Sequence, residues 1–163
     1  KYDGAAKPVP MRGLALALPE PVGVIGVLCP DEAPLLGLIS AMAPAIAMGN
    51  TCVLVPSEPF PLAATDFYQV LETSDLPGGV VNIVTGSALE LARPLAGHMD
   101  VDAVWSFSAT GLSALIERES AANLKRTWVN DALARDWMGP AGEGRAFLRA
   151  ATNVKTIWIP YGE

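Results

Sequence analysis

Residues 22–55 read VGVIGVLCPDEAPLLGLISAMAPAIAMGNTCVLV, and this stretch decides the fold class. The apolar run from Val22 to Cys29 predicts a buried strand. The apolar segment from Leu35 to Met48 predicts a helix, which Gly49 and Asn50 end. A second apolar run, Thr51 to Val55, predicts another buried strand. Two buried strands joined by a helix form the βαβ unit of a parallel sheet, since parallel strands need a long crossover.

The same alternation continues downstream of this unit. Helices are expected at residues 62–73, at 88–96 and ending near 123, and strands at 80–84, from 101 and from 125. Strands that alternate with helices in this way form a parallel sheet with helices on both faces. We therefore predict an α/β fold, a Rossmann-like doubly wound parallel sheet, over residues 22–138.

The two ends of the chain have a different pattern. Residues 1–21 alternate Pro and Gly with small apolar residues, which predicts an extended ribbon. Residues 139–152 combine a turn-rich linker with a short helix, and residues 153–163 predict a strand that is apolar on both sides. A strand of this kind is expected to pair with another strand.

Composition narrows the classes of partner. The chain has 17 acidic and 11 basic residues, a net charge of −6, and no basic cluster in the sequence, so nucleic acid is not expected as a partner. The segment Leu35 to Met48 is shorter than the roughly 20 residues of a membrane span, so no membrane partner is expected. Cys29 and Cys52 are expected at opposite ends of neighbouring strands, as reduced core thiols of a cytoplasmic protein.

The chemistry of a doubly wound sheet is expected in the loops that follow its strands. Asp31 and Glu32 lie in the first of these loops. They could act as a general acid and base, but adjacent carboxylates in a loop usually diverge. Charge at a helix N-terminus is therefore the favoured role.

The other loops carry weaker signals. Glu58 follows the second strand, where an acid can accept hydrogen bonds from a nucleotide ribose or remain an exposed carboxylate. Ser108 or Thr110 is expected to cap the next helix. Neither VTGSA at 84–88 nor SFSATGLS at 106–113 is a dinucleotide fingerprint, and His98 is expected to be a solvated loop residue.

A long ordered set of motifs resembles the NAD-binding domain of the aldehyde dehydrogenase superfamily. The motifs are EPVGV, APAIAMGNT, PSE, LPGGVVNIVTG, DVDAV and NLKR, and they cover about Tyr2 to Asn130. The opening ribbon resembles the oligomerisation hairpin of that family, and TNVKTIWIPYG resembles its C-terminal oligomerisation strand. The resemblance implies the predicted fold and an ancestral NAD site.

The chain departs from the family at the positions that carry chemistry. Glu32 stands where the family has an oxyanion-binding Asn, and a carboxylate cannot donate a hydrogen bond to an oxyanion. Val55 replaces the ribose-binding Lys, and Asn130 replaces the general-base Glu. The cofactor turn near residues 106–110 lacks its glycine. No cofactor is therefore expected in this chain, although NAD remains possible through Glu58, Ser108 and Thr110.

The catalytic domain of the family is also missing. Only roughly twenty residues, 131–151, separate the last cofactor motif from the tail, so there is no place for the cysteine nucleophile. This arrangement resembles the degenerate C-terminal pseudo-domain of the aldehyde dehydrogenase 16 family, whose first module is the ordinary dehydrogenase. The lack of an initial Met fits a piece of a longer protein.

The resemblance implies a non-catalytic module with a structural role in assembly. Its partner would be a catalytic aldehyde dehydrogenase module or a further copy, contacted through Pro8 to Leu18 and Asn153 to Tyr161. One alternative is a regulatory NAD-binding module. Another is part of an NAD-dependent active site that a second chain completes, which would have to supply the nucleophile.

Overall fold

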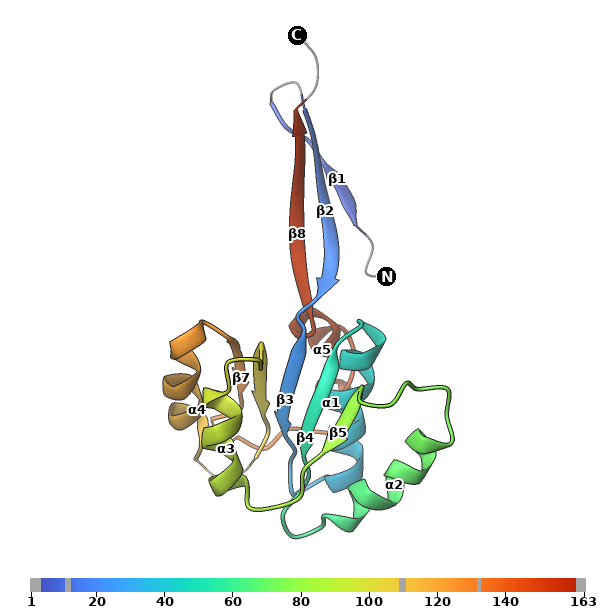
Figure 1. Ribbon diagram of the computed structural model, residues 1–163, viewed down its shortest axis with the longest axis vertical. Coiled ribbons are helices and arrows are strands. Elements are labelled where there is room, and N and C mark those ends of the chain that lie inside the picture. Colours follow the sequence, from blue (N-terminus) through green and yellow to red (C-terminus); the bar gives the residue numbers. More distant parts are fainter. Residues whose placement is uncertain (1–3, 11–12, 109–110, 132, 161–163) are drawn as a thin grey trace.

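The computed structural model of the protein describes residues 4–10, 13–108, 111–131 and 133–160. Within these residues the chain forms one parallel and one antiparallel sheet (Figure 1). The parallel sheet has the strand order β5-β4-β3-β6-β7. Its strands are β3 (Val24–Leu28), β4 (Thr51–Val55), β5 (Val81–Ile83), β6 (Ala103–Ser106) and β7 (Arg126–Val129). The predicted α/β fold with a parallel sheet is confirmed.

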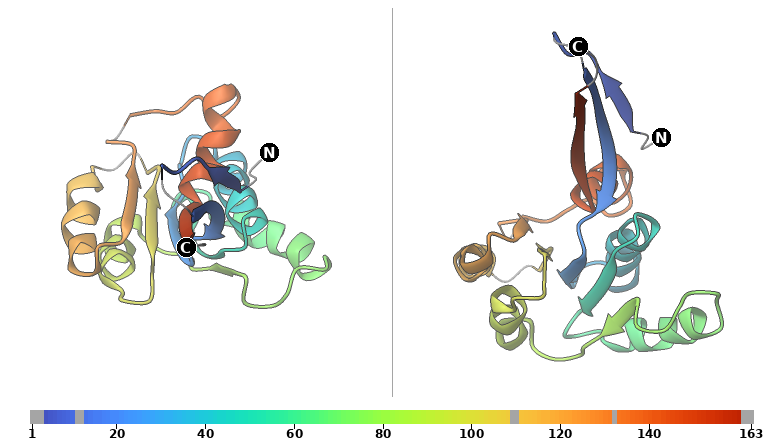
Figure 2. Two further views of the ribbon diagram at one scale, coloured as in Figure 1. Left: turned by 90° about the horizontal axis from the view of Figure 1, so that it is seen from above. Right: turned by 45° about the horizontal axis from the view of Figure 1, so that its top comes forward.

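Helices cover both faces of the parallel sheet (Figure 2). The chain runs from β3 outward through β4 to β5, and then returns to build β6 and β7 on the other side of β3. This reversal places α1 and α2 on one face and α3 and α4 on the other. The bounds are α1 (Pro34–Ala47), α2 (Leu62–Glu72), α3 (Ala88–Gly97) and α4 (Ser113–Ser120), followed by the 3₁₀ turn η1 (Ala121–Asn123).

Helix α1 begins and ends within one residue of its predicted bounds. Pro34 occupies the first turn, where a missing backbone N–H breaks no helical hydrogen bond. Gly49 follows the helix with φ +86°, a backbone conformation that favours glycine. Inside the helix, a Cβ on Gly37 would collide with the ring of Pro30. Glycine therefore lets α1 lie directly against the loop that follows β3.

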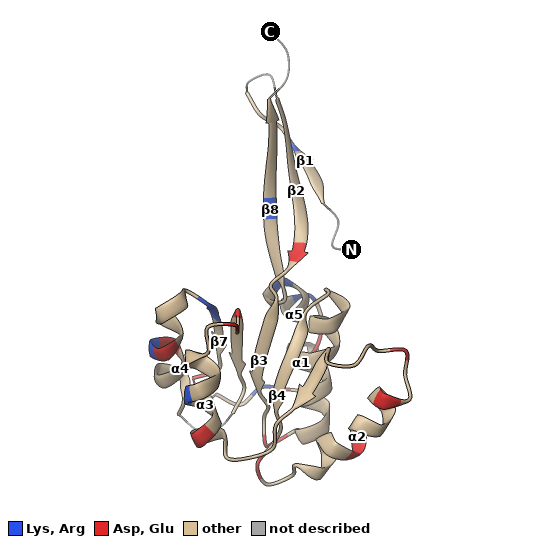
Figure 3. Ribbon diagram, viewed as in Figure 1, with Lys and Arg blue, Asp and Glu red and all other residues tan. Residues whose placement is uncertain are grey.

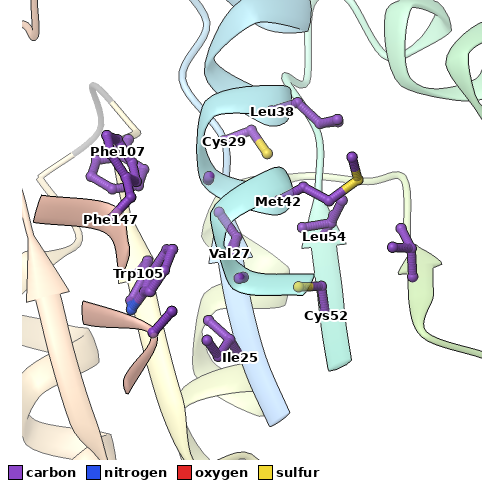
Figure 4. Packing of buried hydrophobic residues seen from close by; sticks show 14 of the residues in the cluster. Ile25, Val27, Cys29, Leu38, Met42, Cys52, Leu54, Trp105, Phe107 and Phe147 are labelled. Carbon is purple, nitrogen blue, oxygen red and sulfur yellow. The ribbon is translucent and has the colours of Figure 1, made fainter. Parts of the chain in front are cut away.

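The core on the α1 face includes residues beyond β7, some of them from the segment 139–152 that was predicted to be a linker and a short helix. Phe147, on α5 (Arg145–Ala150), is fully buried, and Trp137 is 6% exposed. Phe147 lies beside Phe107 and Trp105 of the sheet (Figure 4). The 3₁₀ turn η2 (Pro140–Gly142) lies between Trp137 and α5. We call residues 131–144 the connector, and Trp137 in its middle is part of the folded core.

The antiparallel sheet projects from one end of the domain (Figure 1). Its order is β1-β2-β8, with bounds β1 (Ala5–Lys7), β2 (Gly13–Pro21) and β8 (Thr152–Pro160). Strand β8 pairs with β2 along its whole length, from Pro160 opposite Gly13 to Thr152 opposite Pro21. The predicted ribbon and the predicted tail are thus partners of each other.

Two further expectations can be compared with the structure. The N-cap residue of α4 is Leu112, so Ser108 does not occupy the N-cap position of the helix after β6; Thr110 lies outside the described residues. Cys29 and Cys52 are buried and free, as expected. In the described part of the chain, no helix is long and apolar enough to cross a membrane.

Candidate functional site

The candidate site is the edge of the parallel sheet where its strands end. Glu32, Ser57, Glu58 and Ser108 all follow strands at this edge. Sheets of this topology bind ligands here, beside the point where the strand order reverses. The partners of each side chain decide what chemistry remains possible.

Asp31 and Glu32 each accept a hydrogen bond from a different part of the chain. The indole Nε1 of Trp137 donates to Oε1 of Glu32 at 2.9 Å, and the hydroxyl of Ser57 donates to Oδ1 of Asp31 at 2.7 Å. The two carboxylates therefore diverge, as expected for neighbours in a loop. Both acids lie just before Ala33, the N-cap of α1, so their role as charge near this helix N-terminus stays a prediction. Both acids also fix neighbouring segments.

The connector is held by a second contact next to Glu32. The guanidinium carbon of Arg135 lies 5.0 Å from the ring centre of Phe107, 4.9 Å from Trp128, 5.6 Å from Trp137 and 5.5 Å from Phe147. Its Nη1 donates to the carbonyl of Ala141 at 2.7 Å. Burial among the rings lowers the pKa of Arg135. A cation surrounded by aromatic faces is strongly attracted to them, so this aromatic cage clamps the connector onto the sheet.

Glu58 lies at the start of α3. Its Oε2 accepts a hydrogen bond from the backbone N–H of Ala88, the first residue of that helix, at 3.2 Å. Helix N-termini bind anions because their N–H groups are unpaired and the helix dipole is positive there. The protein's own carboxylate thus pairs with one of the N–H groups at the start of this helix.

Ser108 and Asn130, the two remaining positions predicted for the site, have side chains that are neither acidic nor basic. Ser108 is buried behind β6. Asn130 follows β7, and its side-chain Nδ2 donates to the carbonyl of Leu133 at 3.1 Å. An amide cannot accept a proton at neutral pH as a carboxylate would. Asn130 therefore shapes the start of the connector.

Two cavities adjoin this region. One, of about 440 Å³, lies between the start of α1 and the connector, and Glu32, Leu36, Arg135 and Met138 are among its lining residues. The other, of about 450 Å³, lies on the α3 face of the sheet and is lined almost entirely by apolar residues. Its polar residues, His98 and Asp100, follow α3, away from the strand ends. Among the described residues, no three His, Cys, Asp or Glu side chains are grouped to hold a metal.

The two thiols are expected to be unreactive in the folded chain. Burial raises the pKa of both Cys29 and Cys52 to about 12, so almost no thiolate exists at pH 8. Unfolded thiols ionise near pH 9 and the folded ones near pH 12. The unfolded state therefore binds fewer protons between these values, and stability falls as pH rises through them.

The measurement is labelling with a thiol reagent at pH 8, with and without denaturant, and urea unfolding from pH 8 to 10. Labelling is expected only in denaturant. The double variant Cys29→Ala, Cys52→Ala is expected to flatten the loss of stability above pH 9. Fast labelling of the folded chain would contradict the burial on which this prediction depends.

Replacing Glu32 is expected to loosen the connector rather than to change chemistry. Glu32→Ala removes the acceptor for Trp137 and should lower the free energy of unfolding by about 1–2 kcal/mol. Glu32→Gln should lose less, because its amide oxygen can still accept the bond. Urea unfolding followed by tryptophan fluorescence measures both. Glu143→Ala, at an exposed connector carboxylate, is the control, and an equal loss there would exclude a specific role for Glu32.

Comparison with known proteins gives a consistent result. The model of the aldehyde dehydrogenase family matches residues 1–130. The NADP/NAD-dependent aldehyde dehydrogenase PuuC of Escherichia coli K12 is 37% identical over 130 residues, which are 79% of this chain and 26% of that protein. Human aldehyde dehydrogenase 1A1 is 35% identical over 127 residues, 77% of this chain and 25% of that protein.

Solved structures agree with the sequence matches. The crystal structure of gamma-glutamyl-gamma-aminobutyraldehyde dehydrogenase from Burkholderia cenocepacia superimposes with a TM-score of 0.74 at 38% identity, covering 79% of this chain and 26% of that one. The chain spans about a quarter of the length of these relatives.

Proposed function

The chain belongs to the aldehyde dehydrogenase family, and from this we propose that it is a non-catalytic module whose function is assembly. Its partner is a catalytic aldehyde dehydrogenase module, which oxidises aldehydes with NAD, or a further copy of the chain. In this proposal it corresponds to the degenerate C-terminal pseudo-domain of the aldehyde dehydrogenase 16 family. We assign the parent protein to the cytoplasm, because reducing conditions suit its two free thiols.

The state of the candidate site supports a non-catalytic role. Glu32 accepts a bond from Trp137 where the family pattern needs a donor toward an oxyanion. Both cysteines are buried with raised pKa values, whereas a nucleophilic thiol needs a lowered pKa and access to substrate. Asn130 bonds to the connector. These side chains now stabilise the fold.

The observation that carries the proposal is the antiparallel sheet. Leu14, Leu16 and Leu18 of β2 lie on the same face as Ile157 and Ile159 of β8, because side chains alternate along paired strands. Leu14 is 38% exposed, Leu18 39% and Ile159 46%. We call these five residues the Leu-Ile face. An exposed apolar face of this kind usually marks an interaction surface.

Strand β8 adds an open edge to this face. Among the described residues it pairs only with β2, so the backbone groups along its other edge have no strand partner. Such an edge readily adds a strand from another polypeptide. The face and the edge together fit a sheet that continues into a partner.

Disrupting the Leu-Ile face is expected to abolish association while leaving the domain folded. Ile159→Lys places a charge on this face at a half-exposed position, opposite Leu14. Truncation before Asn153 removes most of β8 but keeps Phe147. Sedimentation equilibrium gives the mass, and circular dichroism checks the fold. Gln69→Lys, at an exposed position on α2 away from the antiparallel sheet, is the control. If Ile159→Lys keeps the oligomeric mass, the Leu-Ile face is not the interface.

A second candidate function is regulatory binding of NAD, which the position of Glu58 favours. Glu58 lies at the strand edge where an acid can meet a ribose. Its carboxylate, however, already accepts the bond from the N–H of Ala88, and the apolar Val55 precedes this loop. These residues fit a nucleotide ribose poorly, so we expect no heat on titrating the chain with NAD to millimolar concentration. Saturable binding that Glu58→Gln weakens would favour the regulatory function instead.

A further inference from the structure

A basic pocket lies where the antiparallel sheet meets the α/β domain. It has a volume of about 610 Å³. Its lining residues are Ala5, Lys7, Ala17, Pro19, Arg126, Arg149, Thr152 and Val154. The cations come from three elements, β1, β7 and α5, which the fold brings together here. Figure 3 shows blue segments at the base of the projecting sheet and on β1.

No carboxylate lines this pocket, and its cations have no carboxylate partner among the described residues. The Nη1 of Arg126 donates to the carbonyl of Thr152 at 2.9 Å, a contact that holds the guanidinium but leaves its charge uncompensated. Lys7 and Arg149 are exposed. Three like charges around one concave surface attract anions.

Glu20, on β2, and Asp102, just before β6, already have partners. Glu20 follows Pro19 on β2, so its side chain points to the opposite face of the sheet, where it pairs with Lys155 at 2.8 Å. The Oδ2 of Asp102 accepts the backbone N–H of Val24 at 2.8 Å. The pocket is therefore a local positive site on a chain whose net charge is −6.

The remaining wall of the pocket is apolar. Ala5, Ala17, Pro19 and Val154 lie on the sheet face opposite the Leu-Ile face. A small inorganic anion would use the cations and leave this wall in water. A peptide with small apolar residues between its carboxylates would use both, because its charges would meet the cations while its side chains cover the wall.

We infer that the basic pocket binds an acidic segment of a partner polypeptide, whose carboxylates meet Lys7, Arg126 and Arg149. This inference rests on the proposed assembly function and adds to it the chemistry of the partner. The Leu-Ile face and the basic pocket lie on opposite faces of one sheet. A partner that bound both would therefore enclose the sheet from two sides.

The test uses the whole chain and a fluorescently labelled peptide, acetyl-Glu-Ala-Glu-Ala-Glu-amide, followed by fluorescence anisotropy at low salt. Lys7→Gln with Arg149→Gln is expected to weaken binding by about tenfold, as for two lost charge-assisted contacts. Lys155→Gln with Arg118→Gln is the control. It removes the same charge from exposed positions away from the pocket and should leave affinity unchanged. Equal losses in both pairs, or no binding by the unaltered chain, would overturn the inference.

Two further arms separate the possible explanations. Inorganic phosphate that competes with the peptide at equal or lower concentration would overturn the peptide assignment in favour of a small-anion site. Competition only at much higher concentration would support the peptide. The mass of the unaltered chain, measured in parallel, tests the assembly function alone. If the chain is a monomer and binds the peptide, the assembly function is refuted and the inference about the basic pocket stands. If the chain is an oligomer and does not bind the peptide, the assembly function stands and the inference about the pocket is refuted.

Discussion

Phe147→Ala is expected to lower the free energy of unfolding by about 3–5 kcal/mol, the usual cost of removing a fully buried aromatic ring. The ring centre of Phe147 lies 5.0 Å from that of Trp128, 5.9 Å from Phe107 and 6.3 Å from Trp105. It is also one wall of the aromatic cage around Arg135. The variant would leave a cavity and remove one face of the cage, so α5 and the connector should both loosen.

Urea unfolding followed by tryptophan fluorescence measures this loss, since the tryptophans surround the site. Leu148→Ala, on the same helix at a half-buried position, is the control and should lose clearly less. Phe147→Leu keeps most of the volume and remains informative if the alanine variant does not fold. A loss below about 1 kcal/mol for Phe147→Ala would mean that α5 is not part of the cooperative core.

Asn50→Ala is expected to cost about 2–4 kcal/mol, because one buried side chain serves three backbone groups. Its Oδ1 accepts the N–H of Gly23 at 2.9 Å, and its Nδ2 donates to the carbonyls of Ala45 at 2.8 Å and Ala151 at 2.9 Å. These groups lie before β3, in α1 and just before β8. Removing the side chain would leave buried donors and acceptors unpaired at the junction of both sheets.

Asn50→Asp is expected to be no better, since it keeps the acceptor but loses both donations and buries a charge. Asn82→Ala is the matched control, because its exposed amide also bonds two carbonyls, those of Cys52 and Gly79. Thermal and urea unfolding should separate the two sites by more than 1 kcal/mol. Similar small losses at both would show that the junction tolerates unpaired groups.

The fold was predictable from sequence where short-range patterns determine it. Apolar runs and helix ends placed β3, α1 and β4 to within about two residues, because hydrophobic period and the Gly49 turn are local properties. Residues 139–152 pack against residues that are distant in the sequence, so local patterns could not predict their position in the core. Phe147 reads as one apolar residue in a short helix, and only its contacts with Trp105, Phe107 and Trp128 reveal a core position.

The sequence predicted where in the fold the candidate site lies, but not which residues its side chains contact. The strand order put Glu32 and Glu58 at the correct edge of the sheet. Glu32 bonds to a residue 105 positions away, and Glu58 to one 30 positions away, and no sequence period relates such pairs. An unpaired aromatic in a turn-rich stretch, Trp137, was the one available signal that the connector packs back onto the domain.

The short segment from Pro21 to Val24 sets the orientation of the projecting antiparallel sheet relative to the parallel sheet. Two residues separate β2 from β3, the middle strand of the parallel sheet. Gly23 has φ +128°, its N–H is bonded to Asn50, and a Cβ there would collide with Asp102. These contacts hold the segment in one conformation, so it does not act as a hinge. Any neighbour docked on the projection would meet the core at a fixed tilt, and that tilt determines whether successive copies close into a ring or extend as a filament.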